Sequence, residues 1–156
     1  MTEFVFDFNT SLKDGHSNEE LFNLLNPSLT RTDGFQYDFE YKGQSIELKS
    51  DNYSMGKTPN FCFEVYSDKE RKTLGGPLQS QSKGVKYFIY FFVQDKKWFI
   101  FDVDQLCERM KKLHKENRTE PNGVRYDNIP NKGWWTYVFL VPRELVQDIV
   151  LDMRFE

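Results

Sequence analysis

The segment 36–49, with the sequence QYDFEYKGQSIELK, constrains the fold more than any other part of the chain. Its residues alternate between apolar and polar on both sides of Lys42-Gly43, a two-residue hairpin signal, although lysine is a weaker first member than asparagine or aspartate. A turn at these two residues places Asp38 opposite Glu47 on one face of the hairpin. The apolar face then carries Tyr37, Phe39, Ile46 and Leu48.

The charged face of this hairpin has two interpretations. Asp38 and Glu47 would repel each other, because like charges in a cross-strand pair are destabilising. A divalent cation between them, with Lys49 further along the same face, would relieve that repulsion. The alternative needs no function, since many antiparallel sheets have one solvated and charged face.

The order of residues around the hairpin resembles the active-site signature of the PD-(D/E)xK nucleases, the restriction-endonuclease-like superfamily. Asp38 is followed, after eight residues, by Glu47-Leu48-Lys49 and then by Ser50-Asp51. The segment 58–65, TPNFCFEV, resembles a later strand of some members. The segment 75–92, GGPLQSQSKGVKYFIYFF, resembles the glycine-rich loop, Ser/Thr-Lys turn and aromatic strand that usually come next.

The resemblance covers about residues 15–106, and it departs from the family pattern at two positions. Tyr37 stands where the family has its name-giving proline, and Pro59 replaces a glycine. The resemblance implies an enzyme that hydrolyses DNA phosphodiester bonds, either an endonuclease or a junction-resolving enzyme acting on duplex or branched DNA. Such members are common in phages and other mobile elements.

The resemblance also implies roles for individual residues. Asp38, Glu47 and the Leu48 carbonyl would hold Mg²⁺ or Mn²⁺ through hard oxygen ligands. Lys49 would position the attacking water or stabilise charge on the phosphate. The remaining candidates are Glu19 as an acidic site residue from the first helix, Glu20 and Glu64 as further candidates, and Gln81, Ser82 and Lys83 as contacts to the substrate.

Each of these further candidates has an ordinary structural explanation. Ser17 and Glu20 have the spacing of a capping box, and acidic residues in a first helical turn are favoured by the helix dipole alone. Glu64 fits the polar face of a strand and reaches the hairpin site only if that strand lies beside the second hairpin strand. Residues 79–83 suit phosphate contacts, because most protein–DNA hydrogen bonds go to phosphate and sugar, but they equally suit a polar loop.

The pattern of segments predicts an α/β fold with one restriction-endonuclease-like core formed by residues 1–156. A central mixed sheet would contain an antiparallel three-strand meander and be flanked by helices. The nearly continuous apolar run 85–93 fits a strand buried on both faces. Residues 119–133, rich in asparagine, proline and glycine, predict a long loop. The other expected elements are helices over 17–25, 104–114 and 142–149, and strands over 61–66, 98–103 and 134–141.

Composition narrows the function further. With 156 residues the chain suits one domain, and its 17% aromatic content predicts an aromatic core. A net charge of −3 argues mildly against a protein that coats nucleic acid, although a local basic face is compatible with it. Two cysteines and the absence of a signal peptide or an apolar span predict a cytoplasmic protein with reduced thiols and no membrane contact.

Two functions outside this assignment remain open at this point. One is a catalytically inactive nucleic-acid-binding or protein-binding domain of the same fold, and the other is a small α/β interaction protein with no metal at the hairpin. The assembly could be a monomer or a homodimer.

Overall fold

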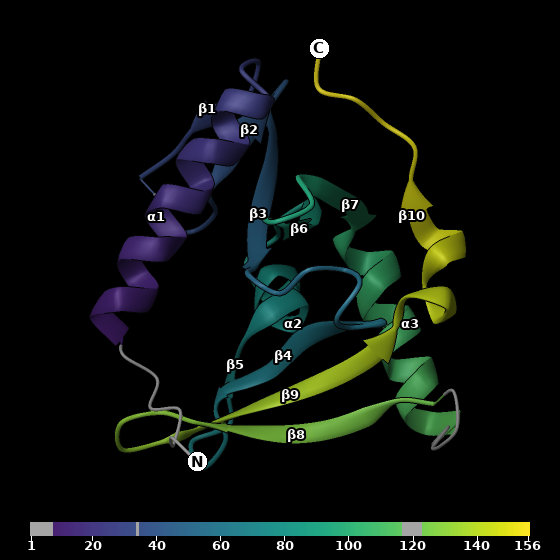
Figure 1. Cartoon of the computed structure of the whole chain (residues 1–156). Coiled ribbons are helices and arrows are strands. Elements are labelled where there is room, and N and C mark those ends of the chain that lie inside the picture. The colour runs from purple at the N-terminus through teal and green to yellow at the C-terminus, as the bar shows by residue number, and fades with distance from the viewer. Residues whose placement is uncertain (1–7, 34, 117–122) are drawn as a thin grey trace.

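The computed structural model describes residues 8–33, 35–116 and 123–156, with the side chains of the first helix described from residue 17 onward. It has two β-sheets and three α-helices, arranged as Figure 1 shows. Sheet A is mixed, with six strands in the order β1-β2-β3-β6-β7-β10, and sheet B has four in the order β5-β4-β9-β8. The strands are β1 (Thr30–Arg31), β2 (Phe39–Tyr41), β3 (Gln44–Asp51), β4 (Asn60–Asp68), β5 (Thr73–Leu74), β6 (Tyr87–Phe92), β7 (Lys97–Asp102), β8 (Arg125–Pro130), β9 (Trp135–Pro142) and β10 (Val150–Leu151).

Strand β6 lies at the centre of sheet A and divides the core into two clusters. Phe88, Tyr90 and Phe92 point to one face of the sheet, and Ile89 and Phe91 point to the other. All five side chains are at most 2% exposed, as expected for a strand covered on both faces. The predicted central strand in the run 85–93 is therefore confirmed.

Helix α1 (Phe8–Leu25) covers one face of sheet A, where Phe22 packs against Phe39, Phe91 and Trp98. Sheet B, α2 (Gly76–Ser82) and α3 (Val103–Glu116) cover the other face. Figure 1 shows sheet B crossing below sheet A, with α3 at its side. In the cluster on the side of sheet B, Phe61 from β4 contacts five other aromatic rings at centroid distances between 4.8 and 5.9 Å: Phe63, Tyr90, Phe92, Phe99 and Phe101.

The hairpin of β2 and β3 has the predicted register. Phe39 pairs with Ile46, and the chain reverses at Lys42 and Gly43, whose φ angles of 49° and 77° are typical of a type I′ turn. Tyr37 differs from the prediction, because it packs on the sheet-B side of the core and not with Phe39. Tyr37 precedes β2, so the strand alternation does not extend to it.

The expected three-strand antiparallel meander is wrong. Strand β3 is followed in sheet A by β6, which runs parallel to it, and β4 instead joins sheet B between β5 and β9. The place beside β3 is taken by β6, because its apolar residues gain most from burial on both faces. The predicted loop over 119–133 is wrong in part, since β8 occupies Arg125–Pro130 and pairs with β9, while residues 119–122 lie outside the described part of the chain.

The predicted helix start at Ser17 is wrong, because α1 begins at Phe8. In a continuous helix the N–H groups near Ser17 bond to carbonyls one turn earlier, so a capping sequence within it is not used. The segment 142–149 forms two 3₁₀ turns, Arg143–Leu145 and Gln147–Ile149, in place of an α-helix. Both cysteines are free thiols. None of the helices in the described part of the chain is long and apolar enough to cross a membrane.

The start of helix α2 approaches β4 closely at Gly75 and Gly76, and the contact at Gly76 gives a testable prediction. Gly76 has a φ of +51°, and a Cβ atom there would lie 2.6 Å from the Glu64 carbonyl oxygen. Gly76→Ala is expected to lower the free energy of unfolding by more than about 2 kcal/mol, because it combines an unfavourable backbone conformation with a clash against main-chain atoms. Chemical denaturation of the variant measures this loss.

Gly84→Ala is the matched control. Gly84 has a φ of +74°, but a Cβ atom there would meet nothing within 4 Å. Its substitution should cost only the backbone penalty of about 1–2 kcal/mol. Equal losses in the two variants would show that the close approach of α2 to β4 contributes nothing to stability.

A candidate metal site between two sheets

Asp38 lies at the entrance to β2 and is held there by the main chain of β3. Its backbone N–H donates to the Ile46 carbonyl over 2.9 Å, and the N–H of Leu48 donates to its Oδ2 over 2.8 Å. The residue is 9% exposed. The hairpin register thus fixes the position of this carboxyl group before any ligand is present.

Glu47 lies opposite Asp38, and the two carboxyl groups are close enough to share a hydrogen bond. Burial raises the pKa of Asp38, and the nearby charge of Glu19 raises it further, while the hydrogen bond from Leu48 lowers it. Burial also raises the pKa of Glu47, followed by repulsion from Asp38, while Lys83 lowers it. Without a cation, the pair therefore retains protons that isolated carboxyl groups would have lost near neutral pH.

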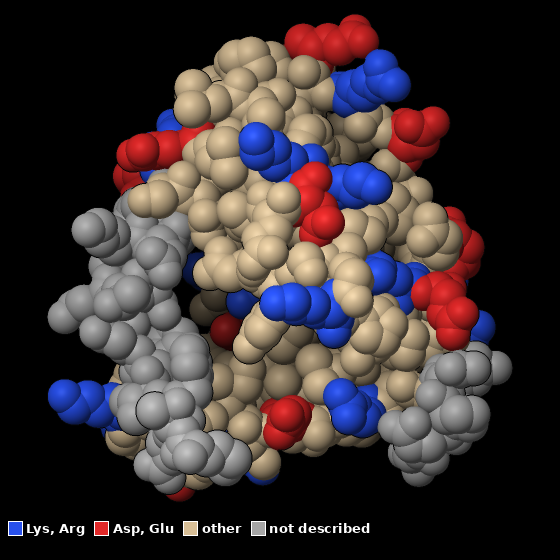
Figure 2. Space-filling model, in the orientation of Figure 1, with Lys and Arg blue, Asp and Glu red and all other residues tan. Residues whose placement is uncertain are grey.

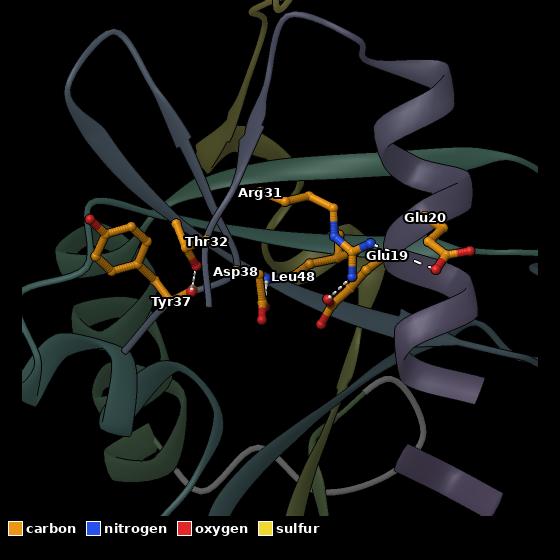
Figure 3. Close-up of polar contacts among 7 residues, drawn as sticks. All are labelled: Glu19, Glu20, Arg31, Thr32, Tyr37, Asp38 and Leu48. Atoms are coloured by element: carbon orange, nitrogen blue, oxygen red, sulfur yellow. Dashed lines mark hydrogen bonds and ion pairs between the residues drawn. The ribbon is translucent and has the colours of Figure 1, made fainter. Parts of the chain in front are cut away.

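Glu19 brings a third carboxyl group to this place from α1. Figure 3 shows its side chain directed toward Asp38, with Arg31 reaching across from β1. Arg31 donates to Glu19 over 3.1 Å and lies 3.8 Å from Glu20. Glu20 is much more exposed than Glu19, at 68% against 22% of the side chain. Of the two helix candidates, Glu19 is therefore the one that faces Asp38.

A cavity of about 120 Å³ opens beside Glu47. Lys49 and Glu64 line it together with Glu47, although they come from strands in different sheets. Figure 2 shows a recess on this side of the molecule, between the positions of α1 and α2, with acidic and basic atoms at its floor. The other lining residues are Leu48, Cys62, Gly76, Gln79 and Phe88.

The premise behind the Glu64 prediction was wrong, because β4 is not the neighbour of β3. Glu64 nevertheless reaches the same cavity as Glu47, since β4 crosses over sheet A and turns Cys62 and Glu64 toward it. Burial raises the pKa of the Cys62 thiol to about 11, so this cysteine stays protonated and is a poor metal ligand.

The donor set fits a hard cation that keeps part of its water shell. In the described part of the chain, no group of three or more His, Cys, Asp or Glu side chains is arranged as a complete metal site. Mg²⁺ does not need one, because it is usually held by one or two carboxylates together with waters and substrate phosphates. Asp38, Glu47 and the main chain at Leu48 provide such oxygen donors, and Glu19 is engaged by Arg31.

The three residues predicted to contact substrate do not gather at one place. Lys83 caps α2 and is close enough to Glu47 to lower its pKa. Gln81 donates to Asp104 over 3.1 Å, and Ser82 donates to the carbonyl of Gln79 over 2.7 Å. Lys83 is thus the only one of the three that an electrostatic interaction links to the carboxyl pair.

Gln79 belongs to the segment 79–83 that suits phosphate contacts, but it was not among the three residues selected from that segment, and it is the one that lines the cavity. It lies on α2, two residues before Gln81 and on a different side of that helix. The sequence held one signal for Gln79. Pro77 marks the start of a helix, and residues two apart on a helix, such as Gln79 and Gln81, point to different sides of it.

The candidate site draws side chains from α1, β3, β4 and α2 and from the residue that precedes β2. No protein-family model, no curated protein and no solved structure matches this chain. The function is therefore argued from the chemistry of these side chains.

Proposed function

We propose that this protein is a metal-dependent nuclease that hydrolyses DNA phosphodiester bonds, as an endonuclease or a junction-resolving enzyme. The observation that carries the proposal is the pair formed by buried Asp38 and half-buried Glu47, of which Glu47 lines a cavity together with Lys49. Two buried acids destabilise a fold when both are ionised, and a bound cation removes that cost. Strained charge arrangements of this kind are concentrated at functional sites.

Asp38, Glu47 and the Leu48 carbonyl would hold Mg²⁺ or Mn²⁺. When bound, such an ion polarises the scissile phosphate and lowers the pKa of a coordinated water. Glu19, whose carboxylate faces Asp38, would orient water in the outer shell while Arg31 keeps it in place.

Lys49 provides a positively charged side chain that would stabilise the charge developing on the phosphate. Lys49 lines the same cavity as Glu47, and its ammonium group would donate hydrogen bonds to a phosphate oxygen as negative charge develops on that oxygen. Gln79 would donate from its amide to the same phosphate, and Lys83 would contact the neighbouring one.

The arrangement of elements supports a restriction-endonuclease-like core as part of this proposal. An N-terminal helix precedes a hairpin that carries Asp38, Glu47 and Lys49. A second helix, α2, then connects to β6, which lies parallel to β3. The strand that carries two of the three residues thus lies inside the sheet, where its side chains are held rigidly.

Cleavage of supercoiled plasmid and of a four-way branched duplex tests the proposal. The wild-type protein should nick or linearise one of them in Mg²⁺ or Mn²⁺, and it should be inactive in EDTA, because the carboxyl pair alone provides no nucleophile. Intact substrates in all metals, with purified and folded protein, would refute the proposed activity.

Lys49→Met is expected to lower the cleavage rate by about a hundredfold, the typical effect of removing one charge-stabilising donor. The variant should still bind Mg²⁺, since its carboxyl groups are unchanged. Lys42→Met, at the exposed turn of the same hairpin, is the matched control and should cleave at the wild-type rate. Equal rates for the two variants would remove Lys49 from the site.

One observation favours a second candidate, a catalytically inactive DNA-binding or protein-binding domain. The Glu19 carboxylate is engaged by Arg31, and the Asp38–Glu47 pair can be stabilised by shared protons in place of a metal. Retained DNA binding without cleavage in any divalent metal would support this candidate.

A further inference from the structure

The end of sheet B farthest from α3 carries a second pocket that the proposed chemistry does not use. The turn after β4 and the β8–β9 hairpin meet here, and the N–H of Lys69 donates to the Trp135 carbonyl over 2.8 Å. The pocket has a volume of about 390 Å³ and is lined by Lys69, Glu70, Asn128 and Trp135. We call it the tip pocket.

The tip pocket combines a flat aromatic ring with groups that hydrogen-bond and a cation. Trp135 is 47% exposed, a large share for an indole that no described residue stacks upon. Lys69 donates to the Oδ1 atom of Asn128 over 2.9 Å, which fixes the amide so that its NH₂ group faces away from Lys69. A nucleobase fits these features, because bases stack on aromatic side chains and are recognised through their edges by amides.

A row of stacked tyrosines leads along this face of sheet B toward the tip. Tyr137 lies at 6.2 Å from Tyr66 and at 5.1 Å from Tyr126, with interplanar angles of 18° and 10°. The ammonium group of Lys69 sits 4.9 Å above the Tyr137 ring. The cation–π contact, the hydrogen bond to Asn128 and the main-chain bond to Trp135 thus fix the position of Lys69. Binding a ligand therefore costs little additional side-chain entropy at Lys69.

The charge of the tip favours an anionic ligand. The two turns that meet at the tip carry lysines or arginines at 69, 71, 72 and 132 against the acids Asp68 and Glu70, in a chain whose net charge is −3. Arg71 pairs with Asp68 at 3.7 Å, which leaves Glu70 as the acid that opposes a phosphate at the pocket itself. The local excess of positive charge suits phosphate contacts.

The path from the candidate metal site to the tip pocket selects the kind of nucleic acid. Lys69, the first residue after β4, follows Glu64 by five residues, an extended span of about 17 Å at ~3.3 Å per residue. Cross-strand pairing places Glu64 with Val138 on one face of sheet B, and Tyr66 and Asn128 with Tyr137 on the other, because the register of β4 shifts between Glu64 and Tyr66. A nucleic acid that occupies both sites must therefore pass around the end or an edge of the sheet.

A duplex would have to bend sharply to follow such a path, at a substantial cost in elastic energy given its persistence length of about 150 base pairs, whereas a single strand follows it without that cost. We propose that the tip pocket binds an unpaired nucleotide of a single-stranded DNA arm, with its base stacked on Trp135 and its phosphate near Lys69. The choice of DNA rests on the nuclease function proposed above. The inference deepens that function, since it names branched or flapped DNA with an unpaired arm as the substrate class.

Binding measured in EDTA tests this inference apart from any cleavage. The probes are a labelled oligothymidylate about 15 nucleotides long, a blunt duplex and the same duplex with a single-stranded arm. The wild type should bind the two probes with unpaired nucleotides more tightly than the blunt duplex. Trp135→Ala should raise their Kd about tenfold, the expected effect of losing one stacked base, and should leave blunt-duplex binding unchanged.

Three further variants keep the result independent of folding. Trp135→Phe retains a ring and should recover most of the affinity. Trp134→Ala changes an adjacent, 36% exposed tryptophan that does not line the pocket, so it should bind as the wild type does. Glu70→Gln removes the opposing acid and should tighten binding about twofold, a gain that damage to the fold cannot produce.

The inference is overturned if the wild type does not prefer unpaired DNA, or if Trp135→Ala and Trp134→Ala bind alike. It is also overturned if Trp135→Ala abolishes a concentration-dependent dimer in sedimentation, because the tip would then be a contact between two copies of the chain. Loss of arm binding in Trp135→Ala, in a protein that never cleaves DNA, would uphold the tip pocket and refute only the nuclease. If Trp135→Ala cleaves branched DNA at the wild-type rate, the nuclease is upheld and the tip pocket is refuted.

Discussion

Asp38→Asn is expected to lower Mg²⁺-dependent DNA cleavage by more than about a thousandfold. It removes a negatively charged ligand from the metal, and that loss is larger than the loss of one hydrogen-bond donor. The fold should survive the change. The asparagine carbonyl oxygen can still accept the hydrogen bond that Leu48 now donates to Asp38 over 2.8 Å. Single-turnover cleavage rates, with circular dichroism of both proteins, measure the effect.

Asp33→Asn is the matched control for this variant. Asp33 is exposed, lies five residues earlier, and accepts a hydrogen bond from the Phe35 N–H over 3.0 Å that asparagine can also accept. It should cleave at the wild-type rate. A similar modest effect in both variants would show that cleavage does not depend on the carboxyl pair.

The stability of the metal-free protein is expected to fall as the pH rises from about 5 to above 8. Burial and the nearby charge of Glu19 raise the pKa of Asp38 to about 7, and burial and repulsion from Asp38 raise that of Glu47 to about 8. The unfolded chain ionises both groups near pH 4, whereas the folded chain holds their protons longer. The free energy of unfolding therefore decreases through this window, by several kcal/mol in total.

Asp38→Asn should remove much of this pH dependence, so the variant is expected to be more stable than the wild type near pH 8 and little different near pH 4. Mg²⁺ should raise the melting temperature of the wild type more at pH 8 than at pH 6, because it binds the ionised form. It should have no such effect on Asp38→Asn. A wild type whose stability is flat across this range would mean that the two acids are not buried as a pair.

Features encoded by neighbouring residues could be predicted from the sequence. The hairpin register follows from Lys42-Gly43, because a two-residue turn determines every pair that succeeds it. The buried strand β6 follows from an unbroken apolar run. The juxtaposition of Asp38 and Glu47 is a consequence of that register, and it was therefore accessible before the structure.

Features that depend on contacts between distant segments could not be predicted in this way. Alternation identified β4 as a strand, but it carries no information on which sheet the strand joins. The bond between Arg31 and Glu19 depends on how α1 packs over sheet A. Glu64 entered the right cavity from an unexpected strand, because the crossing of the two sheets is set by the aromatic core and not by residues near Glu64.

Titration calorimetry of Mg²⁺ and Mn²⁺ near pH 8 tests most directly whether Asp38 and Glu47 form a cation site. We predict one ion per chain, with a heat that varies with the ionisation enthalpy of the buffer, because binding must release the protons that these carboxyl groups retain. The double variant Asp38→Asn/Glu47→Gln should take up no ion. Absence of uptake by the wild type, or the same uptake by the double variant, would contradict the account.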